Sequence, residues 1–238
     1  MEIIKYKKVL EYSYSLGAFP TIELLRNKNE YVEKVLIHST FTNEEVLNEI
    51  NGLVSKDKIF INDKLINKLS DKENIFVIGI FRKYKIELDN DNHLVLDRPS
   101  NMGNLGTIIR SSLGFNIHNI AIIRPGVDMF DPKVIRSSMG SIFSVNVEYF
   151  DSLEEYIKKY PKHTLYKFML QASKSLRDEE FNKYPISLVF GNEATGIDQK
   201  YLDENSLIIK HSDKIDSLNI TNAVSIALYE YSSKIEKR

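Results

Sequence analysis

Short apolar runs alternate with polar loops and amphipathic stretches along most of the chain. Runs of four to eight residues rich in Ile, Val and Phe are typical of buried strands. In the second half of the chain, strands are predicted at 94–96, 120–123, 144–150, 163–170, 186–190 and 207–209. Between and after them, helices are predicted up to Gly114, at 131–139, from Ser152 to Pro161 and at 220–235. This alternation predicts an α/β fold with a mostly parallel sheet that helices cover on both faces.

The first ninety residues show a smaller α/β pattern of their own. It comprises a helical pattern over 5–14, a helix from Pro20, a helix opened by a Thr42–Glu45 capping box, a helical turn at 65–69, and strands at 31–37, 58–61 and 75–80. We predict two domains, 1–88 and 93–238, joined by the charged segment 82–92 as a linker. The alternative is that 82–92 forms the solvated tip of a hairpin within one domain.

The composition is that of a globular protein, without the bulk positive charge that would indicate nucleic-acid binding. It is 42% apolar and 27% charged, which argues against disorder. The formal net charge is −1, so any binding of nucleic acid must use a local basic patch. No apolar run approaches the length of a membrane span, and residues 1–8 are charged, so we expect neither a membrane segment nor a signal peptide.

Cysteine is absent, which excludes disulfides, thiolate nucleophiles and zinc–thiolate sites. The absence fits a reducing compartment, and we expect a cytoplasmic protein. The five histidines are scattered without H-x-x-x-H spacing, so we expect no metal site.

Two predicted strands lead to loops that carry small and amide residues. The strand at 186–190 leads into 190–196, Phe-Gly-Asn-Glu-Ala-Thr-Gly, and the strand at 207–209 precedes 216–219, Asp-Ser-Leu-Asn. We expect these strands to be adjacent, with both loops at the carboxyl edge of the sheet, where open α/β sheets bind ligands. Glycine lacks a Cβ, so the backbone of the first loop can approach a ligand closely. The predicted ligand is flat, polar and nucleoside-like.

A third loop, 101–106, follows the strand at 94–96 and begins a helix. Helix N-termini attract anions, Asn104 offers a donor and an acceptor, and Arg110 offers a fork of donors suited to phosphate. The alternative is that Asn104 only caps the helix and Arg110 forms a surface ion pair. The sequence contains neither G-x-G-x-x-G nor G-x-x-x-x-G-K-[ST], which argues against an ordinary Rossmann oxidoreductase and a P-loop NTPase.

Three further polar residues belong to the predicted strand-end loops. Glu193 has an ordinary alternative as a carboxylate at a helix start, and Ser217 and Asn219 have one as N-caps of the last helix. Taken together with Asn104 and Arg110, they indicate one polar site at the carboxyl ends of the strands.

These loops resemble the three ordered motifs of a known family. The segments 104–110, 190–196 and 217–220 are similar to the motifs of the SpoU/TrmH branch of the SPOUT-class RNA methyltransferases, and 136–140 is similar to another common segment of that branch. The resemblance covers roughly 94–232. The sequence departs from the family at Asn101-Met102, where many members have Asp-Pro or Asn-Pro.

The resemblance implies a C-terminal trefoil knot and a homodimer whose sites use residues of both subunits. It further implies that domain 1–88 recognises substrate RNA and that 93–238 is the methyltransferase domain. The cofactor would be S-adenosylmethionine, and the residues implied to bind it are Phe190, Gly191, Asn192, Ile209 and Leu218.

The resemblance also implies the reaction, which is methyl transfer to a ribose 2′-hydroxyl of RNA without a metal ion. The residues implied to carry it are Asn104, Arg110, Glu193, Ser217 and Asn219. An arginine is too basic to lose its proton easily, so we expect Arg110 to hold the target phosphate and orient the ribose.

We expect ribosomal RNA as substrate ahead of transfer RNA. Two alternatives are a non-catalytic RNA-binding or assembly factor on the same scaffold, and a small-molecule-binding α/β protein.

Overall fold

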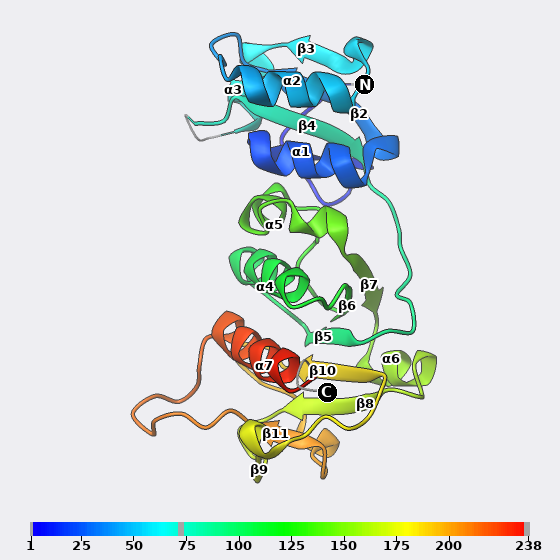
Figure 1. Cartoon of the computed structure of the whole chain (residues 1–238), viewed down its shortest axis with the longest axis vertical. Coiled ribbons are helices and arrows are strands. Elements are labelled where there is room, and N and C mark those ends of the chain that lie inside the picture. The colour runs from blue at the N-terminus through cyan, green and yellow to red at the C-terminus, as the bar shows by residue number, and fades with distance from the viewer. Residues whose placement is uncertain (1, 71–73, 236–238) are drawn as a thin grey trace. The chain divides into compact units, whose positions relative to one another are not determined.

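The computed structural model describes residues 2–70 and 74–235 (Figure 1). The outer ends of both predicted domain ranges, at 1 and 238, therefore fall outside the described residues. The chain forms two compact units, one of residues 1–85 with 128–144 and the other of residues 86–127 with 145–238. Residues 128–144, which lie inside the predicted range 93–238, thus group with the first unit. The assignment of separate functions to the two predicted domains stays a prediction.

The first unit contains a four-stranded sheet in the order β1-β4-β2-β3. Its elements are β1 (Tyr12–Leu16), α1 (Ala18–Asn27), β2 (Val32–Ile37), α2 (Glu44–Leu53), β3 (Ile59–Ile61), α3 (Asp63–Leu69), β4 (Val77–Arg82) and α5 (Pro132–Ser137), with short 3-10 turns at 29–31, 56–58 and 141–144. Strand β4 is antiparallel to both β1 and β2, whereas β2 and β3 are parallel. The unit is therefore the small α/β unit that the sequence predicts, with α5 added from later in the chain.

Two predictions for the first unit are wrong. The helical pattern at 5–14 is replaced by irregular backbone followed by β1, because Tyr12 and Tyr14 place their rings in the core and their hydroxyls accept backbone N–H bonds from Ile4 and Tyr6. The predicted capping box at Thr42 is also wrong, since the side chain of Asn43 accepts the N–H of Val46 and caps α2.

The second unit contains a seven-stranded sheet in the order β7-β6-β5-β10-β8-β11-β9. Its elements are β5 (His93–Asp97), α4 (Met102–Gly114), β6 (Asn119–Ile123), β7 (Asn146–Phe150), α6 (Leu153–Lys159), β8 (Thr164–Phe168), β9 (Lys174–Ser175), β10 (Ile186–Phe190), β11 (Ser206–Ile208) and α7 (Ile220–Ile235), with 3-10 turns at 176–178 and 199–201. Each pairing between neighbouring strands of this sheet is parallel, which agrees with the predicted fold class.

The order of the strands corrects one expectation. The strands at 186–190 and 207–209 were expected to be neighbours, but β8 lies between β10 and β11 and pairs with both. Their carboxyl ends still lie at one edge, because the three strands are parallel. The segment 83–92 joins strands of two different sheets, so the hairpin alternative for it is wrong.

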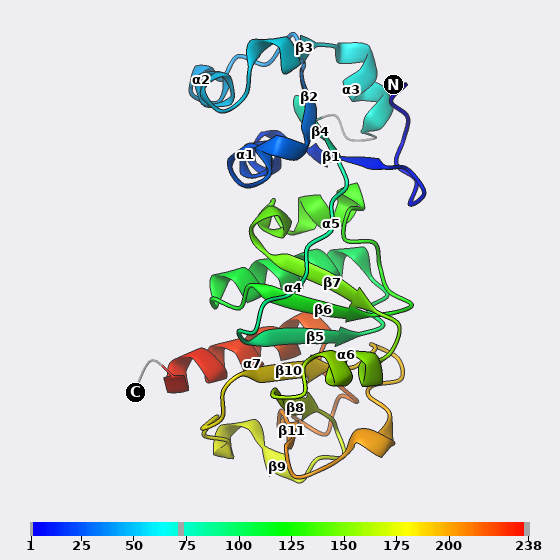
Figure 2. The same cartoon turned by 90° about the vertical axis from the view of Figure 1, so that its right-hand side faces the viewer.

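Helices cover both faces of the seven-stranded sheet, as Figure 2 shows. On one face, Val95, Ala121 and Val189 pack in a cluster with Leu153 and Tyr156 of α6. Side chains alternate between faces along a strand, so the intervening strand residues face α4 and α7. These two helices pack against each other, with the hydroxyl oxygens of Ser111 and Ser225 3.1 Å apart. Burial on both faces explains the continuous apolar runs of the central strands.

Within the described part of the chain, no helix combines the length and the apolar character needed to cross a lipid bilayer.

Candidate functional site

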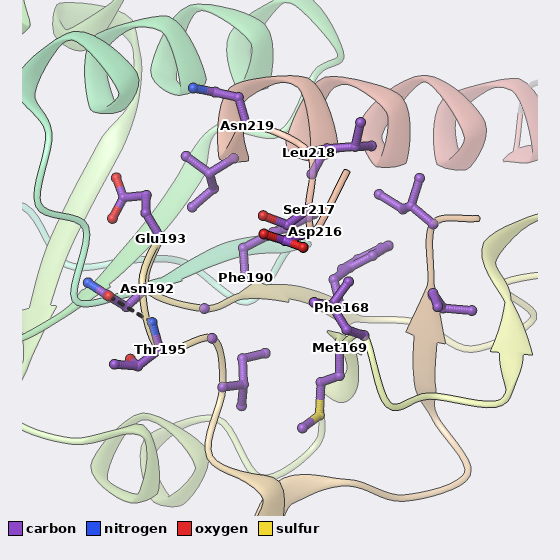
Figure 3. Close-up of a pocket in the computed structure, with 18 of the residues that line it drawn as sticks. Phe168, Met169, Phe190, Asn192, Glu193, Thr195, Asp216, Ser217, Leu218 and Asn219 are labelled. Atoms are coloured by element: carbon purple, nitrogen blue, oxygen red, sulfur yellow. Dashed lines mark hydrogen bonds between the residues drawn. The ribbon is translucent and has the colours of Figure 1, made fainter. Parts of the chain in front are cut away.

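A cavity of about 610 Å³ lies at the carboxyl ends of β8, β10 and β11 (Figure 3). Its walls come from the last residues of these strands and from the loops that follow them, 191–197 and 216–219. Asn104 at the start of α4 also lines it. The three segments that carry the sequence motifs therefore meet around one cavity within the second unit.

The loop 191–197 doubles back on itself to form one wall of this cavity. The N–H of Gly196 donates to the carbonyl of Asn192 over 2.9 Å. A Cβ on Gly191 would lie 2.3 Å from the carbonyl carbon of Gly196 and 2.4 Å from the nitrogen of Ile197, so only glycine fits there. Gly196 has a φ of +66°, which also favours glycine. The two glycines are thus needed for the turn itself.

Asn192 ties this turn to the loop that follows β5. Its side-chain oxygen accepts the N–H groups of Ala194 (2.9 Å) and Thr195 (3.2 Å), which holds the turn closed. Its side-chain nitrogen donates to the carbonyl of Arg98 over 2.8 Å. One amide side chain therefore fixes both the shape of the wall and its position.

Glu193 forms a second connection between the same two loops. Its carboxylate accepts from the side-chain nitrogen of Asn104 at 3.3 Å and from the hydroxyl of Ser100 at 3.0 Å. Burial raises the pKa of Glu193, but hydrogen bonds from its own backbone, Asn104 and Ser100 outweigh burial and lower the pKa. Glu193 is therefore an ionised anchor between the first and second motifs, and its alternative interpretation as a helix-start carboxylate is wrong because residues 193–195 form a turn.

The alternative for Asn104 is wrong as well. Asn101 is the N-cap of α4, and its side-chain oxygen accepts the N–H of Asn104 over 3.0 Å. The Asn104 side chain is thereby left to bond Glu193.

Asn219, in contrast, does what its ordinary alternative predicts. Its side-chain oxygen accepts the N–H of Thr221 (2.8 Å) in the first turn of α7. It also lines the cavity, as do Ser217, Leu218 and Ile209. Asn219 therefore both begins the last helix and contributes to the site.

Two aromatic rings form an apolar part of the cavity wall. Phe168 ends β8 and Phe190 ends β10, and the strand register places them side by side. Their ring centroids are 4.3 Å apart with an interplanar angle of 4°, so the rings stack. A flat ligand can pack against such a surface. The sequence predictions missed Phe168, because only the strand order places it beside Phe190.

Arg110 is the one predicted site residue that does not line this cavity. It lies on α4, six residues beyond Asn104, and its side chain is exposed. No ion pair or hydrogen bond engages the side chain of Arg110 among residues 2–70 and 74–235, so the alternative of a surface ion pair is not met among these residues. The other nine predicted residues are brought together, whereas Arg110 faces solvent.

Among the residues with assigned positions, no group of three or more His, Asp or Glu side chains could hold a metal ion. The expectation of a metal-free reaction stays a prediction.

Comparison with known proteins supports the sequence resemblance. A 23S rRNA (uridine(2479)-2′-O)-methyltransferase from Streptomyces viridochromogenes is 30% identical over 146 residues, which are 58% of this chain and 50% of that protein. A protein named as a tRNA (cytidine(34)-2′-O)-methyltransferase from Listeria monocytogenes is 33% identical over 146 residues, 58% of this chain and 85% of that protein. The chain spans about half the length of the first curated relatives that it matches.

The fold is shared with solved structures. The SpoU methyltransferase AviRb from Streptomyces viridochromogenes, in complex with AdoMet, matches 95% of this chain and 91% of its own length with a TM-score of 0.81 and 22% identity. The model of the SpoU rRNA Methylase family matches residues 91–229, which is more than half of the chain and includes every residue that lines the cavity. The chain therefore belongs to the SpoU rRNA methylase family.

Proposed function

We propose that this chain is an S-adenosylmethionine-dependent RNA ribose 2′-O-methyltransferase. The observation that carries the proposal is the convergence of three motif segments on one cavity at the carboxyl ends of β8, β10 and β11. Family membership supports it, and so do the relatives named for 2′-O-methylation. The shared fold of an AdoMet-bound SpoU methyltransferase supports the choice of cofactor.

The walls of the cavity suit the implied cofactor. Phe190, Leu218 and Ile209 supply apolar surface, while Asn192 is polar and Gly191 has no side chain to keep a ligand away from its backbone. S-adenosylmethionine combines a flat adenine ring, which can pack against the apolar surface, with a ribose and a charged amino-acid end, which can bond to polar groups, so both kinds of wall are used. Methyl transfer is an in-line displacement, and holding the ribose oxygen about 3–3.5 Å from the methyl carbon supplies much of the rate.

We further propose that the enzyme acts as a homodimer in which Arg110 completes the cavity of the partner subunit. Arg110 does not line its own cavity and stands on an exposed stripe of α4 with Thr107. The neighbouring helix α7 exposes Ile226 (42%) and Tyr229 (63%), and a dimer would cover this apolar surface. In that position Arg110 would hold a phosphate of the RNA and orient the ribose hydroxyl. We also propose that the C-terminal part of the chain forms the trefoil knot that the family resemblance implies.

Mixing two inactive variants tests this arrangement. Arg110→Ala should keep cofactor affinity and lose methyl transfer, and Gly191→Ala should lose the cofactor. Co-refolded in equal amounts, they should regain about a quarter of the activity, because half of the dimers are mixed and one of their two sites is intact. No recovery, in mixed dimers isolated with two affinity tags, would contradict a shared site.

We favour ribosomal RNA as substrate and keep transfer RNA as the alternative. The family description and the Streptomyces relative support ribosomal RNA. The Listeria relative, matched over 85% of its length, supports transfer RNA. We propose that the protein acts in the cytoplasm, on the basis of its lack of cysteine.

Transfer of tritiated methyl groups to separated ribosomal and transfer RNA, followed by mapping of 2′-O-methylated positions, distinguishes these substrates. Methylation of neither RNA, with intact cofactor binding, would favour the non-catalytic RNA-binding alternative and refute the enzymatic proposal.

A further inference from the structure

The permanently charged side chains that line the cavity within one chain are both acidic. Among the described residues, the only carboxylates that line it are Glu193 and Asp216, and no lysine or arginine does so. His211 is the remaining titratable side chain of the wall. The part of the cavity that one chain supplies therefore offers negative charge and no permanent positive charge.

The two carboxylates differ in what they already bind. Glu193 is held by Asn104 and Ser100 and serves to join two loops. Asp216 is exposed, and within the described chain no hydrogen bond or ion pair engages its carboxylate. Figure 3 shows its side chain among those that line the cavity, on the segment that leads into α7. Asp216 is thus the carboxylate that is left to interact with a ligand.

The methyl donor and its product differ by one charge. S-adenosylmethionine carries a sulfonium cation, and when the C–S bond breaks, the electron pair stays on sulfur and leaves a neutral thioether. The methyl group joins the ribose oxygen, which gives up its proton to solvent or phosphate. The ammonium, the carboxylate and the adenosine are unchanged, so only the charge at sulfur distinguishes the two molecules electrostatically.

We propose that Asp216 favours the cationic methyl donor over the neutral product, and so promotes exchange of product for fresh cofactor. This rests on the proposed function, since it requires the cavity to bind S-adenosylmethionine. The stacked rings of Phe168 and Phe190 line the same cavity, and an apolar wall lessens the screening of charges beside it. Because Asp216 is exposed, the effect remains modest, about three- to fivefold in affinity.

Isothermal titration of the full-length protein with three ligands tests the inference. The ligands are S-adenosylmethionine, S-adenosylhomocysteine and sinefungin, whose protonated amine replaces the methylsulfonium group. In Asp216→Asn, affinity for the two cationic ligands should fall about three- to fivefold, while affinity for S-adenosylhomocysteine should stay constant. In the wild-type protein, the ratio of the affinity for S-adenosylmethionine to that for S-adenosylhomocysteine should also decrease as the salt concentration is raised.

Two further variants serve as controls. Asp213→Asn removes a charge from the same segment at an exposed position that does not line the cavity, so the ratio of affinities should remain that of the wild type. Asp216→Glu keeps the charge and should retain most of the ratio. Melting curves show whether each variant is folded.

Other outcomes have definite meanings. An equal loss for all three ligands in Asp216→Asn would place the carboxylate at the shared ammonium group and overturn the inference, as would an unchanged ratio. Failure of the folded wild-type protein to bind any of the three would refute the proposed function itself.

Discussion

Replacing Gly191 by alanine should disable the cavity while the rest of the unit stays folded. The added Cβ would lie 2.3 Å from the backbone of Gly196, and ordinary contact begins at 3.4 Å, so the turn must open by about 1 Å. The obstacle is backbone, which cannot swing aside as a flexible side chain can. A displacement of about 1 Å in a positioning element can cost on the order of 100-fold in reaction rate, and we take the same factor for binding because the displaced wall also lines the cofactor cavity. We therefore expect affinity for S-adenosylmethionine to fall by about 100-fold.

Two other glycines separate the causes of such a loss. In Gly196→Ala the added Cβ would meet no atom within 4 Å, but the φ of +66° at this position strains any residue other than glycine by roughly 1–2 kcal/mol. Gly52→Ala, in the last turn of α2, has open space and a helical backbone and should stabilise the protein by up to roughly 0.5–1 kcal/mol. Cofactor binding should therefore decrease in the order Gly52→Ala, Gly196→Ala, Gly191→Ala.

Calorimetric titration with the cofactor measures the effect, and thermal melting separates it from unfolding. If folded Gly191→Ala bound the cofactor within threefold of wild type, the closeness of the two backbone segments would not matter for the site, and the reasoning would be refuted.

Three other predictions follow from the same structure. Burial lowers the pKa of His93 to about 4, so the folded state favours the neutral ring. The contribution of His93 to the free energy of unfolding should be fully present above about pH 6.5 and fall by roughly 1.4 kcal/mol per pH unit from there towards pH 4. A urea midpoint that stays constant from pH 6.5 to 5.5 would contradict this. Asn104→Ala removes one hydrogen bond to Glu193 and should lower the free energy of unfolding by about 0.5–1.5 kcal/mol. Asn101→Ala, which removes the N-cap of α4, is the control and should cost about 1 kcal/mol. A denaturation curve of Asn104→Ala that coincides with that of the wild type would exclude the link between the loops. Affinity for RNA should fall linearly with the logarithm of salt concentration in filter-binding assays, because phosphate contacts release counterions, and a flat series would argue against phosphate recognition.

The sequence predicted the elements of the second unit well because their burial is unambiguous. Leu94, Leu96, Ile120 and Leu188 are fully buried, and continuous apolar runs of this kind occur where helices cover both faces of a sheet. Periodicity was less reliable at 5–14, where aromatic residues fit a helix or a strand equally. There the pairing of β1 with β4, which no local pattern reveals, decides the structure.

Most of the site could also be predicted from the sequence, because its residues lie in loops at the ends of the buried strands. Nine of the ten predicted residues line one cavity, because motif segments mark the ends of strands that happen to be parallel. Phe168 and Ser100 were missed, since their contributions depend on strand order and on a bond to Glu193 between distant loops. Arg110 could not be placed from one chain, because its environment in a homodimer depends on a second copy.

The walls of the cavity differ in how they are held. The turn 191–197 is fastened to its neighbours through Asn192 and Glu193, whereas 209–219 contains neither helix nor strand. Opening the fastened side requires several bonds to break together, so the unfastened side opens at a lower free energy. We therefore expect the cofactor to enter and leave past 209–219, and the turnover rate to respond to the stiffness of that segment more than to its contacts with RNA.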